Sequence, residues 1–99
     1  MIEFPQARVD VKVVDLGSEL LIIDDRRRRF HFLNSTARRI WDLCDGTHSR
    51  NEIEAEIARL FPATPVERVR HDVDKALEEL EREEVIVWVA AELPRPKEA

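Results

Sequence analysis

The spacing of apolar residues changes near residue 34, and this change constrains the fold more than any other feature. Before it, apolar and polar residues alternate over 9–16 and 28–33, and a short apolar run fills 19–24. Alternation is typical of half-buried strands, and a continuous run suits a central strand. The polar residues 24–27 lie where a hairpin turn belongs. We therefore expect three strands in an antiparallel meander.

After residue 34, apolar residues recur every three or four positions, which is the spacing of amphipathic helices. Each expected helix also carries its own start or stop signal. The expected helices are one opened by Asn34 or Ser35 and closed near Gly46, one from the Ser49–Glu52 capping box to Pro62, and one from Thr64-Pro65 to about Arg82. A last strand or wing follows over 84–90.

These elements predict a single α+β domain over residues 9–90. The expected architecture is winged-helix-like: a three-stranded antiparallel sheet packed on a three-helix bundle, with a short C-terminal strand. Residues 1–8 contain Pro5 and no pattern, and we expect an extended lead-in there. Residues 91–99 are expected to form a flexible tail.

The residue types argue against an enzyme. The three histidines are far apart in sequence, and none stands in a metalloprotease or histidine–cysteine motif. Cys44 lies on the apolar stripe of the first helix, which favours a buried structural thiol over a nucleophile. With only two glycines, the chain has no phosphate-cradling loop. We expect no catalysis, no cofactor and no metal site.

Charge and hydropathy limit the partners. The formal net charge is −5, whereas nucleic-acid binding rests on a basic face. No apolar run approaches the roughly 20 residues of a membrane helix, and the N-terminus lacks the pattern of a secretory signal. We expect a cytoplasmic protein that binds neither nucleic acid nor membrane.

Four consecutive arginines, Arg26 to Arg29, stand out in this acidic chain. They directly precede the alternating segment that carries Phe30 and Phe32. Asp24 and Asp25 come just before them and partly neutralise them. Three interpretations stay open: a cationic strand edge that resists aggregation, a surface that steers acidic residues of a partner, and a local nucleic-acid patch, which the acidic net charge disfavours.

The segment "FHFLNSTARRIWDLCDG", residues 30–46, resembles the PqqD family, the small peptide-binding proteins of pyrroloquinoline quinone biosynthesis. The resemblance extends over about residues 9–88 as an ordered set of short motifs. They are Leu33-Asn34, Thr36-Ala37, Leu43-Cys44-Asp45-Gly46, Ile53 and Ile57 with Phe61-Pro62, Asp72-Val73, and Leu77 with Leu80. Two glycines common in relatives are missing, one in the turn at 24–27 and one after the third helix.

The resemblance implies a RiPP recognition element, a non-catalytic chaperone for ribosomally made peptides in natural product biosynthesis. Such a protein binds the leader segment of a precursor peptide as an added strand beside its third strand, in a groove against the third helix. It presents the peptide to a modifying enzyme such as a radical SAM enzyme, protease or cyclase. The alternative is a winged-helix nucleic-acid-binding or regulatory domain.

The expected peptide-binding residues come from two elements. The third strand supplies the edge, and small residues of the third helix leave room for the far wall of the groove. The candidates are Arg28, Arg29, Phe30, His31, Phe32, Leu33, Val69, Val73 and Ala76.

Overall fold

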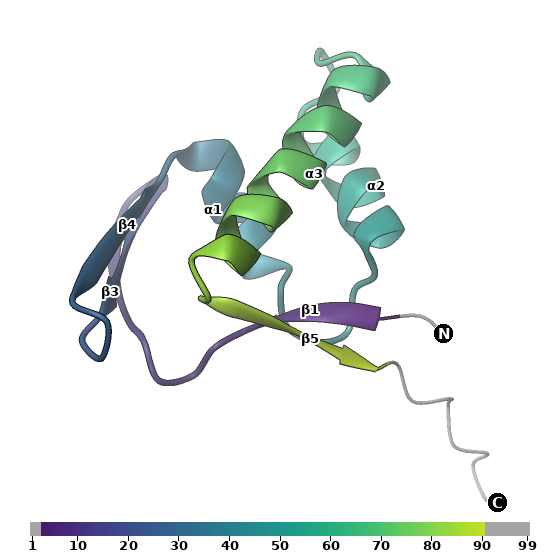
Figure 1. Ribbon diagram of the computed structural model, residues 1–99. Helices are drawn as coiled ribbons and strands as arrows, with labels where there is room; N and C mark the ends of the chain where they lie inside the picture. Colours follow the sequence, from purple (N-terminus) through teal and green to yellow (C-terminus); the bar gives the residue numbers. More distant parts are fainter. Residues whose placement is uncertain (1–2, 91–99) are drawn as a thin grey trace, which may run out of the picture.

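The computed structural model describes residues 3–90, which form five strands and three helices (Figure 1). In chain order these are β1 Glu3–Ala7, β2 Lys12–Leu16, β3 Glu19–Asp24, β4 Arg29–Leu33, α1 Ser35–Asp42, α2 Arg50–Leu60, α3 Val66–Arg82 and β5 Ile86–Ala90. The expected α+β class is confirmed, as are the antiparallel meander and the three helices that follow it.

The meander forms a three-stranded sheet in the order β2-β3-β4. Its register places Leu20 opposite Leu33 and Ile22 opposite His31, so these residues share one face. That inner face packs on the helices, and Leu20, Ile22 and Leu33 are buried there. The helices extend this core with the apolar stripes that their spacing predicts: Ile40, Trp41, Cys44, Ile53, Ile57, Val69, Val73, Leu77 and Leu80.

The helix ends follow local signals. The Asn34 side chain accepts a hydrogen bond from the Ala37 amide at 2.9 Å and so caps α1. At α2, Ser49 accepts from the Glu52 amide while Glu52 accepts from the Ser49 amide, which is the expected capping box. At α3, Pro65 is the N-cap and no side chain caps the helix, so Thr64 does not serve as expected.

The sheet arrangement differs from the expected one at the N-terminus. Residues 3–7, expected to be part of a lead-in outside the domain, form β1 and pair antiparallel with β5 in a separate two-stranded sheet. The Ala7 amide donates to the Cys44 carbonyl at 2.8 Å, and the Gly46 amide donates to the Pro5 carbonyl at 3.0 Å. The motif that closes α1 therefore holds β1 in place. The expected tail, 91–99, lies outside the described residues.

Strand β2 is shorter and more exposed than the alternation of 9–16 indicates. It starts at Lys12, and all five of its residues are exposed. Val9, expected to be half-buried, is 93% exposed. The reason is the position of the helices: α1 contacts β3 and β4, so β2 extends beyond the part of the sheet that packs on the core.

Two residues other than glycine adopt a positive φ angle among those described, Arg28 at 57° and Glu84 at 63°. Arg28 lies in the β3–β4 turn, and Glu84 follows α3. These are the two segments where the resemblance described above implies a glycine that the sequence lacks. The backbone keeps the left-handed conformation there although an L side chain disfavours it.

Candidate functional site

Strand β4 lies at an edge of its sheet. Within the described residues it pairs with β3 alone, so one row of its backbone N–H and C=O groups is free of strand partners. The strand is five residues long, Arg29 to Leu33, and α3 runs beside its free side (Figure 1). A free strand edge is a template for pairing with another extended chain.

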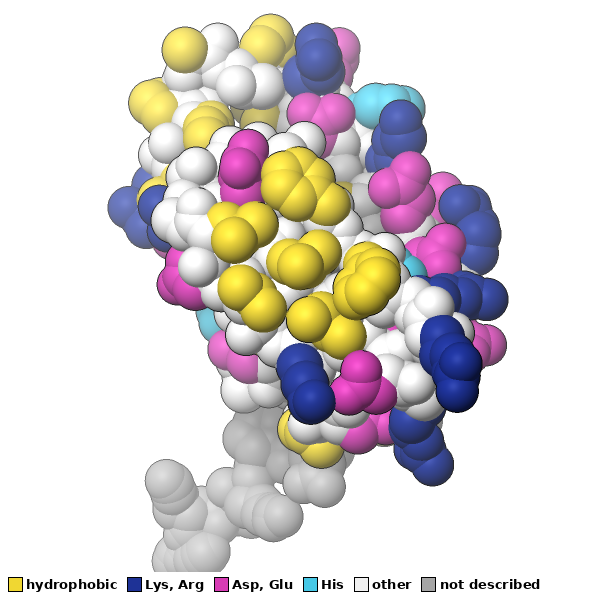
Figure 2. Space-filling view, turned by 90° about the vertical axis from the view of Figure 1, so that its left-hand side faces the viewer, with side chains coloured by type: hydrophobic (Ala, Val, Ile, Leu, Met, Phe, Trp, Pro, Cys, Tyr) yellow, Lys and Arg dark blue, Asp and Glu magenta, His cyan; other side chains and the backbone are white. Residues whose placement is uncertain are grey.

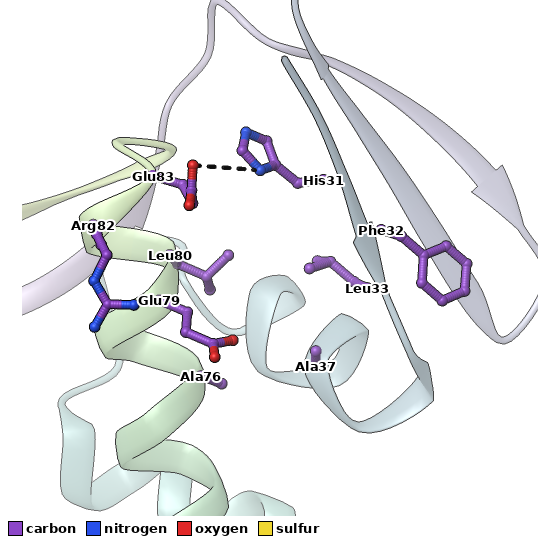
Figure 3. A pocket seen from close by; sticks show the side chains of 9 residues that line it. All are labelled: His31, Phe32, Leu33, Ala37, Ala76, Glu79, Leu80, Arg82 and Glu83. Atoms are coloured by element: carbon purple, nitrogen blue, oxygen red, sulfur yellow. Dashed lines mark ion pairs between the residues drawn. The ribbon is translucent and has the colours of Figure 1, made fainter.

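A groove of about 280 Å³ separates β4 from the C-terminal half of α3. Figure 3 shows the side chains of His31 and Leu33 pointing from β4 toward the helix, whereas Phe32 points to the other side of the strand. The residues that line the groove are His31, Phe32, Leu33, Ala37, Ala76, Glu79, Leu80, Arg82 and Glu83.

The floor of this groove is apolar. Leu33 of β4 and Leu80 of α3 are 7% and 4% exposed, so each shows only a small part of its side chain. Ala37 of α1 and Ala76 of α3 also line the groove; both are partly buried and pack against the core. Two short alanine side chains at this point leave the space that a guest side chain would fill.

The rim of the groove is charged. Arg29 donates a hydrogen bond to Glu83 at 2.8 Å, and Nδ1 of His31 lies 4.0 Å from the same carboxylate oxygen. Glu79 and Arg82 are exposed on the helix side. Nε2 of His31 is buried and has no hydrogen-bond partner among residues 3–90. The rim thus offers both signs of charge within a short distance.

A second hollow of about 420 Å³ continues the groove between α1 and α3. It shares Ala37, Ala76 and Glu79 with the first and reaches Arg68 near the start of α3. From Glu83 to Arg68 the helix rises about 22 Å. An extended peptide covers that distance with about six or seven residues.

The structure groups the nine expected site residues differently. It brings His31, Phe32, Leu33 and Ala76 together at the groove. Val69 and Val73 are 2% and 0% exposed and belong to the core, so they cannot form its far wall. Phe30 is 71% exposed on the opposite face of the sheet. On α3, the residues that fill the core and the residues that face β4 lie side by side, but they are different residues.

Five groove residues were not among the expected ones: Ala37 on α1, and Glu79, Leu80, Arg82 and Glu83. The last four lie in the final turns of α3 and at its C-cap. Leu80 was expected only as part of the core stripe. The three charged residues, Glu79, Arg82 and Glu83, have the pattern of solvent-facing positions. Nothing in the local pattern shows that this end of the helix lies beside β4.

The arginine run is held mostly by carboxylates of the chain itself. Arg26 pairs with Asp10 at 3.2 Å, and Arg27 pairs with Glu84 at 2.7 Å and with the buried Asp24 at 3.3 Å. Arg29 pairs with Glu83, as described above. Arg28 is exposed and has no ion-pair partner within the described residues. Among the four arginines of the run, Arg28 is therefore the one without a partner carboxylate in residues 3–90, and it lies beside Ile23 and Phe30.

Cys44 is 3% exposed, as the sequence predicts for a structural thiol. Burial, together with the nearby charges of Asp45 and Asp42, raises the pKa of this thiol to about 12. Its Sγ donates to the Ile40 carbonyl at 3.3 Å. The thiolate, the nucleophilic form, is therefore strongly disfavoured at neutral pH.

These features define a small α+β domain in which β4, an edge strand of the three-stranded sheet, presents a free edge to a groove beside a helix. The chain belongs to the PqqD family, because residues 19–86 match the family described as coenzyme PQQ synthesis protein D (PqqD). The resemblance seen in the sequence is thereby confirmed. No curated protein sequence matches the chain.

Two solved structures share the fold. The structure of TbiB1 in complex with the TbiA(beta) leader peptide matches with a TM-score of 0.74 at 19% identity, over 87% of this chain and 99% of that one. The structure of the heterocyclase TruD matches with a TM-score of 0.60 at 19% identity, over 92% of this chain but 12% of that one. Among residues 3–90, no helix is long and apolar enough to cross a membrane.

Proposed function

We propose that this protein binds the leader segment of a ribosomally made precursor peptide and presents it to a modifying enzyme without catalysing a reaction itself. The peptide adds as a strand to the free edge of β4 and places alternate side chains in the groove against α3. The observation that carries this proposal is the free edge of β4 facing an apolar groove floor.

The comparisons support the proposal at the level of the family and the fold. The chain belongs to the PqqD family, and TbiB1, which has the same fold, was solved with a leader peptide. TruD, a heterocyclase, contains a region of the same fold. A peptide substrate and a modifying enzyme are accordingly the partners that we assign to this chain. We place the protein in the cytoplasm, where ribosomes make such precursors.

Binding energetics require the groove as well as the edge. Four or five backbone hydrogen bonds contribute about 1 kcal/mol each. Ordering the same number of peptide residues costs about 1–2 kcal/mol each, which cancels that gain. Each apolar peptide side chain buried against Leu33, Ala37, Ala76 and Leu80 then contributes about 1.5–3 kcal/mol. Two or three such anchors supply about 3–9 kcal/mol, and the upper end of this range reaches the roughly 8 kcal/mol of micromolar binding.

A winged-helix nucleic-acid domain would need a helix with basic side chains for the groove of a duplex. Helix α3 instead carries Glu67, Asp74, Glu78, Glu79 and Glu81, whose charges a phosphate backbone repels. Three of the four arginines in the 26–29 run are paired with the chain's own carboxylates. The charge distribution favours the peptide over the nucleic acid.

The test is a calorimetric titration of the protein with the precursor peptides encoded beside its gene. We expect a dissociation constant in the micromolar range or below. Ala76→Arg places a long charged side chain in the groove and should weaken binding at least tenfold. Ala55→Arg, the same change at an exposed position of α2, is the control and should bind normally.

Two results would contradict the proposal: no heat from the unmodified protein with any of these peptides, or Ala76→Arg binding as tightly as Ala55→Arg. Val73 is unsuitable for such a test. It is 0% exposed in the core, so a charged side chain there would unfold the domain rather than report on binding.

A further inference from the structure

The outer face of the three-stranded sheet, opposite the helices, is apolar, and no other element of residues 3–90 covers it. We use the term outer sheet face for Val14, Leu16, Leu21, Ile23, Phe30 and Phe32. The register aligns Val14, Leu21 and Phe32 in one cross-strand row, and Ile23 and Phe30 lie in the next. Figure 2 shows a continuous group of hydrophobic side chains on this side of the molecule.

The exposure of these residues is large. Phe30 and Phe32 are 71% and 59% exposed, and Leu16 and Val14 are 48% and 40% exposed. The whole face presents on the order of 500 Å² of apolar surface, the size of the largest patch on a typical monomer, which is often functional. A stable interface needs about 800 Å² from each partner, so two copies stacked on this face alone fall short.

Strand β4 belongs to both surfaces. His31 and Leu33 point into the groove, whereas Phe30 and Phe32 alternate with them and point outward. A peptide strand added beside β4 would extend the outer sheet face with every second side chain of its own. A protein that covers this face therefore contacts the recognition domain and its bound peptide together. The modifying enzyme is the partner that must meet both.

The rim adds a charge preference. Glu19 lies at the Leu16 end of the face, and Lys12 lies at the other end beside Ile23, paired with Asp25 at 3.0 Å. Arg28 shares a surface hollow with Ile23 and Phe30 and has no ion-pair partner among the described residues. Carboxylates on a partner would pair with Arg28 at this end.

We propose that the outer sheet face docks the peptide-modifying enzyme, through a flat apolar surface of that enzyme with acidic residues opposite Arg28. The proposal rests on the peptide-binding function proposed above. It further requires that a bound leader peptide strengthens docking, because the peptide enlarges the contact surface. By linkage, the enzyme strengthens peptide binding by the same factor.

The test uses variants on β2, the strand farthest from the peptide edge. Val14→Arg and Leu16→Arg place a charge on the outer sheet face at exposed positions, so neither should unfold the domain. Their affinity for the purified modifying enzyme encoded beside the gene, measured by biolayer interferometry, should fall at least tenfold. Their affinity for the precursor peptide should stay within twofold of normal. Val66→Arg, at a 64% exposed position of α3, is the control and should change neither affinity.

Each other outcome has a defined meaning. Normal enzyme binding by both β2 variants, or no enzyme binding by the unmodified protein with peptide present, overturns the docking proposal. A dimer seen by sedimentation at tens of micromolar, and abolished by Leu16→Arg, also overturns it and assigns the face to a second copy. If the unmodified protein binds no peptide but binds the enzyme, and the β2 variants weaken that binding, the docking surface is supported and the peptide-binding function is rejected.

Discussion

The guanidinium group of Arg29 lies 2.8 Å from Oε1 of Glu83, and this ion pair joins the first residue of β4 to the residue that follows α3. The pair lies at one end of the groove, between the strand and the helix. Both side chains are about half exposed, 51% and 40%. An exposed pair of this kind contributes little to stability, because water screens it and two long side chains must be ordered.

We therefore expect a coupling energy of about 0.2–1 kcal/mol between Arg29→Ala and Glu83→Ala in a double-mutant cycle. Urea unfolding of the two single variants and the double variant measures it. A coupling well above 1 kcal/mol would show that the pair is a structural tie rather than an adjustable rim contact.

Amide hydrogen exchange should reveal the free edge of β4 directly. In an antiparallel pair, alternate residues bond to the neighbouring strand, and the others face outward. The outward-facing amides of Arg29–Leu33 should exchange rapidly in the free protein and at least tenfold more slowly with saturating precursor peptide. The outward-facing amides of β2, at the opposite edge, serve as the internal reference and should not change. Slower exchange at β2 instead of β4 would show that the peptide binds the opposite edge of the sheet and would contradict the proposed site.

The left-handed conformation of Arg28 predicts a stabilising substitution. Its φ angle of 57° disfavours any L side chain, whereas glycine adopts this conformation without a steric penalty. We expect Arg28→Gly to raise the free energy of unfolding by up to about 1 kcal/mol, partly offset by the greater freedom of glycine in the unfolded chain.

Arg26→Gly is the matched control, two residues earlier in the same turn. Arg26 does not have a positive φ angle and pairs with Asp10, so its replacement should lower the free energy of unfolding. Thermal and urea unfolding of the two variants give the comparison. Equal destabilisation by both would mean that the turn does not store strain at Arg28.

Acid should weaken the attachment of α1 to the β2–β3 hairpin. Arg38 of α1 bonds to Asp15 at 2.8 Å, and this hydrogen bond, with a second one from the Gly17 amide, holds the pKa of Asp15 at about 2, below its ordinary 3.8. A carboxyl whose pKa is depressed by folding stabilises the protein above its unfolded pKa. That stabilisation is lost as pH falls through the folded pKa.

The free energy of unfolding should accordingly decrease between about pH 4 and about pH 2. Asp15→Asn should make this decrease shallower, and Arg38→Met should do the same because it removes the other partner. Some slope will remain in both variants, since Arg8 also lowers the pKa of Asp10 to about 2. Chemical unfolding at a series of pH values tests this, and an unchanged slope in both variants would exclude the link.

The sequence predicts those parts of the structure that depend on local signals. The change from alternation to helical spacing predicts the meander and the three helices, and Ser49 with Glu52 predicts the start of α2. Strand β1 escapes prediction because it lacks alternation and contains Pro5. Its partner, β5, lies about eighty residues away, so only the folded chain reveals the pairing.

The candidate site follows the same division. Alternation separates His31 and Leu33 from Phe30 and Phe32, but it does not show which face the helices cover. The core and the groove wall occupy adjacent faces of α3, so Val73 and Ala76 look equivalent in the sequence although only Ala76 lines the groove. Which face of a helix meets which strand is decided by tertiary packing.

The pairing of β1 with β5 brings Glu3 opposite Ala90, so the first and last described residues of the chain meet. This arrangement makes the domain a suitable subject for circular permutation. A short linker could join the two strands, and new termini could open in the exposed Gly17-Ser18 turn. The new ends would lie at the hairpin of β2 and β3. Such a permutant would retain every strand pair, and the edge of β4 that does not pair with β3 would stay free.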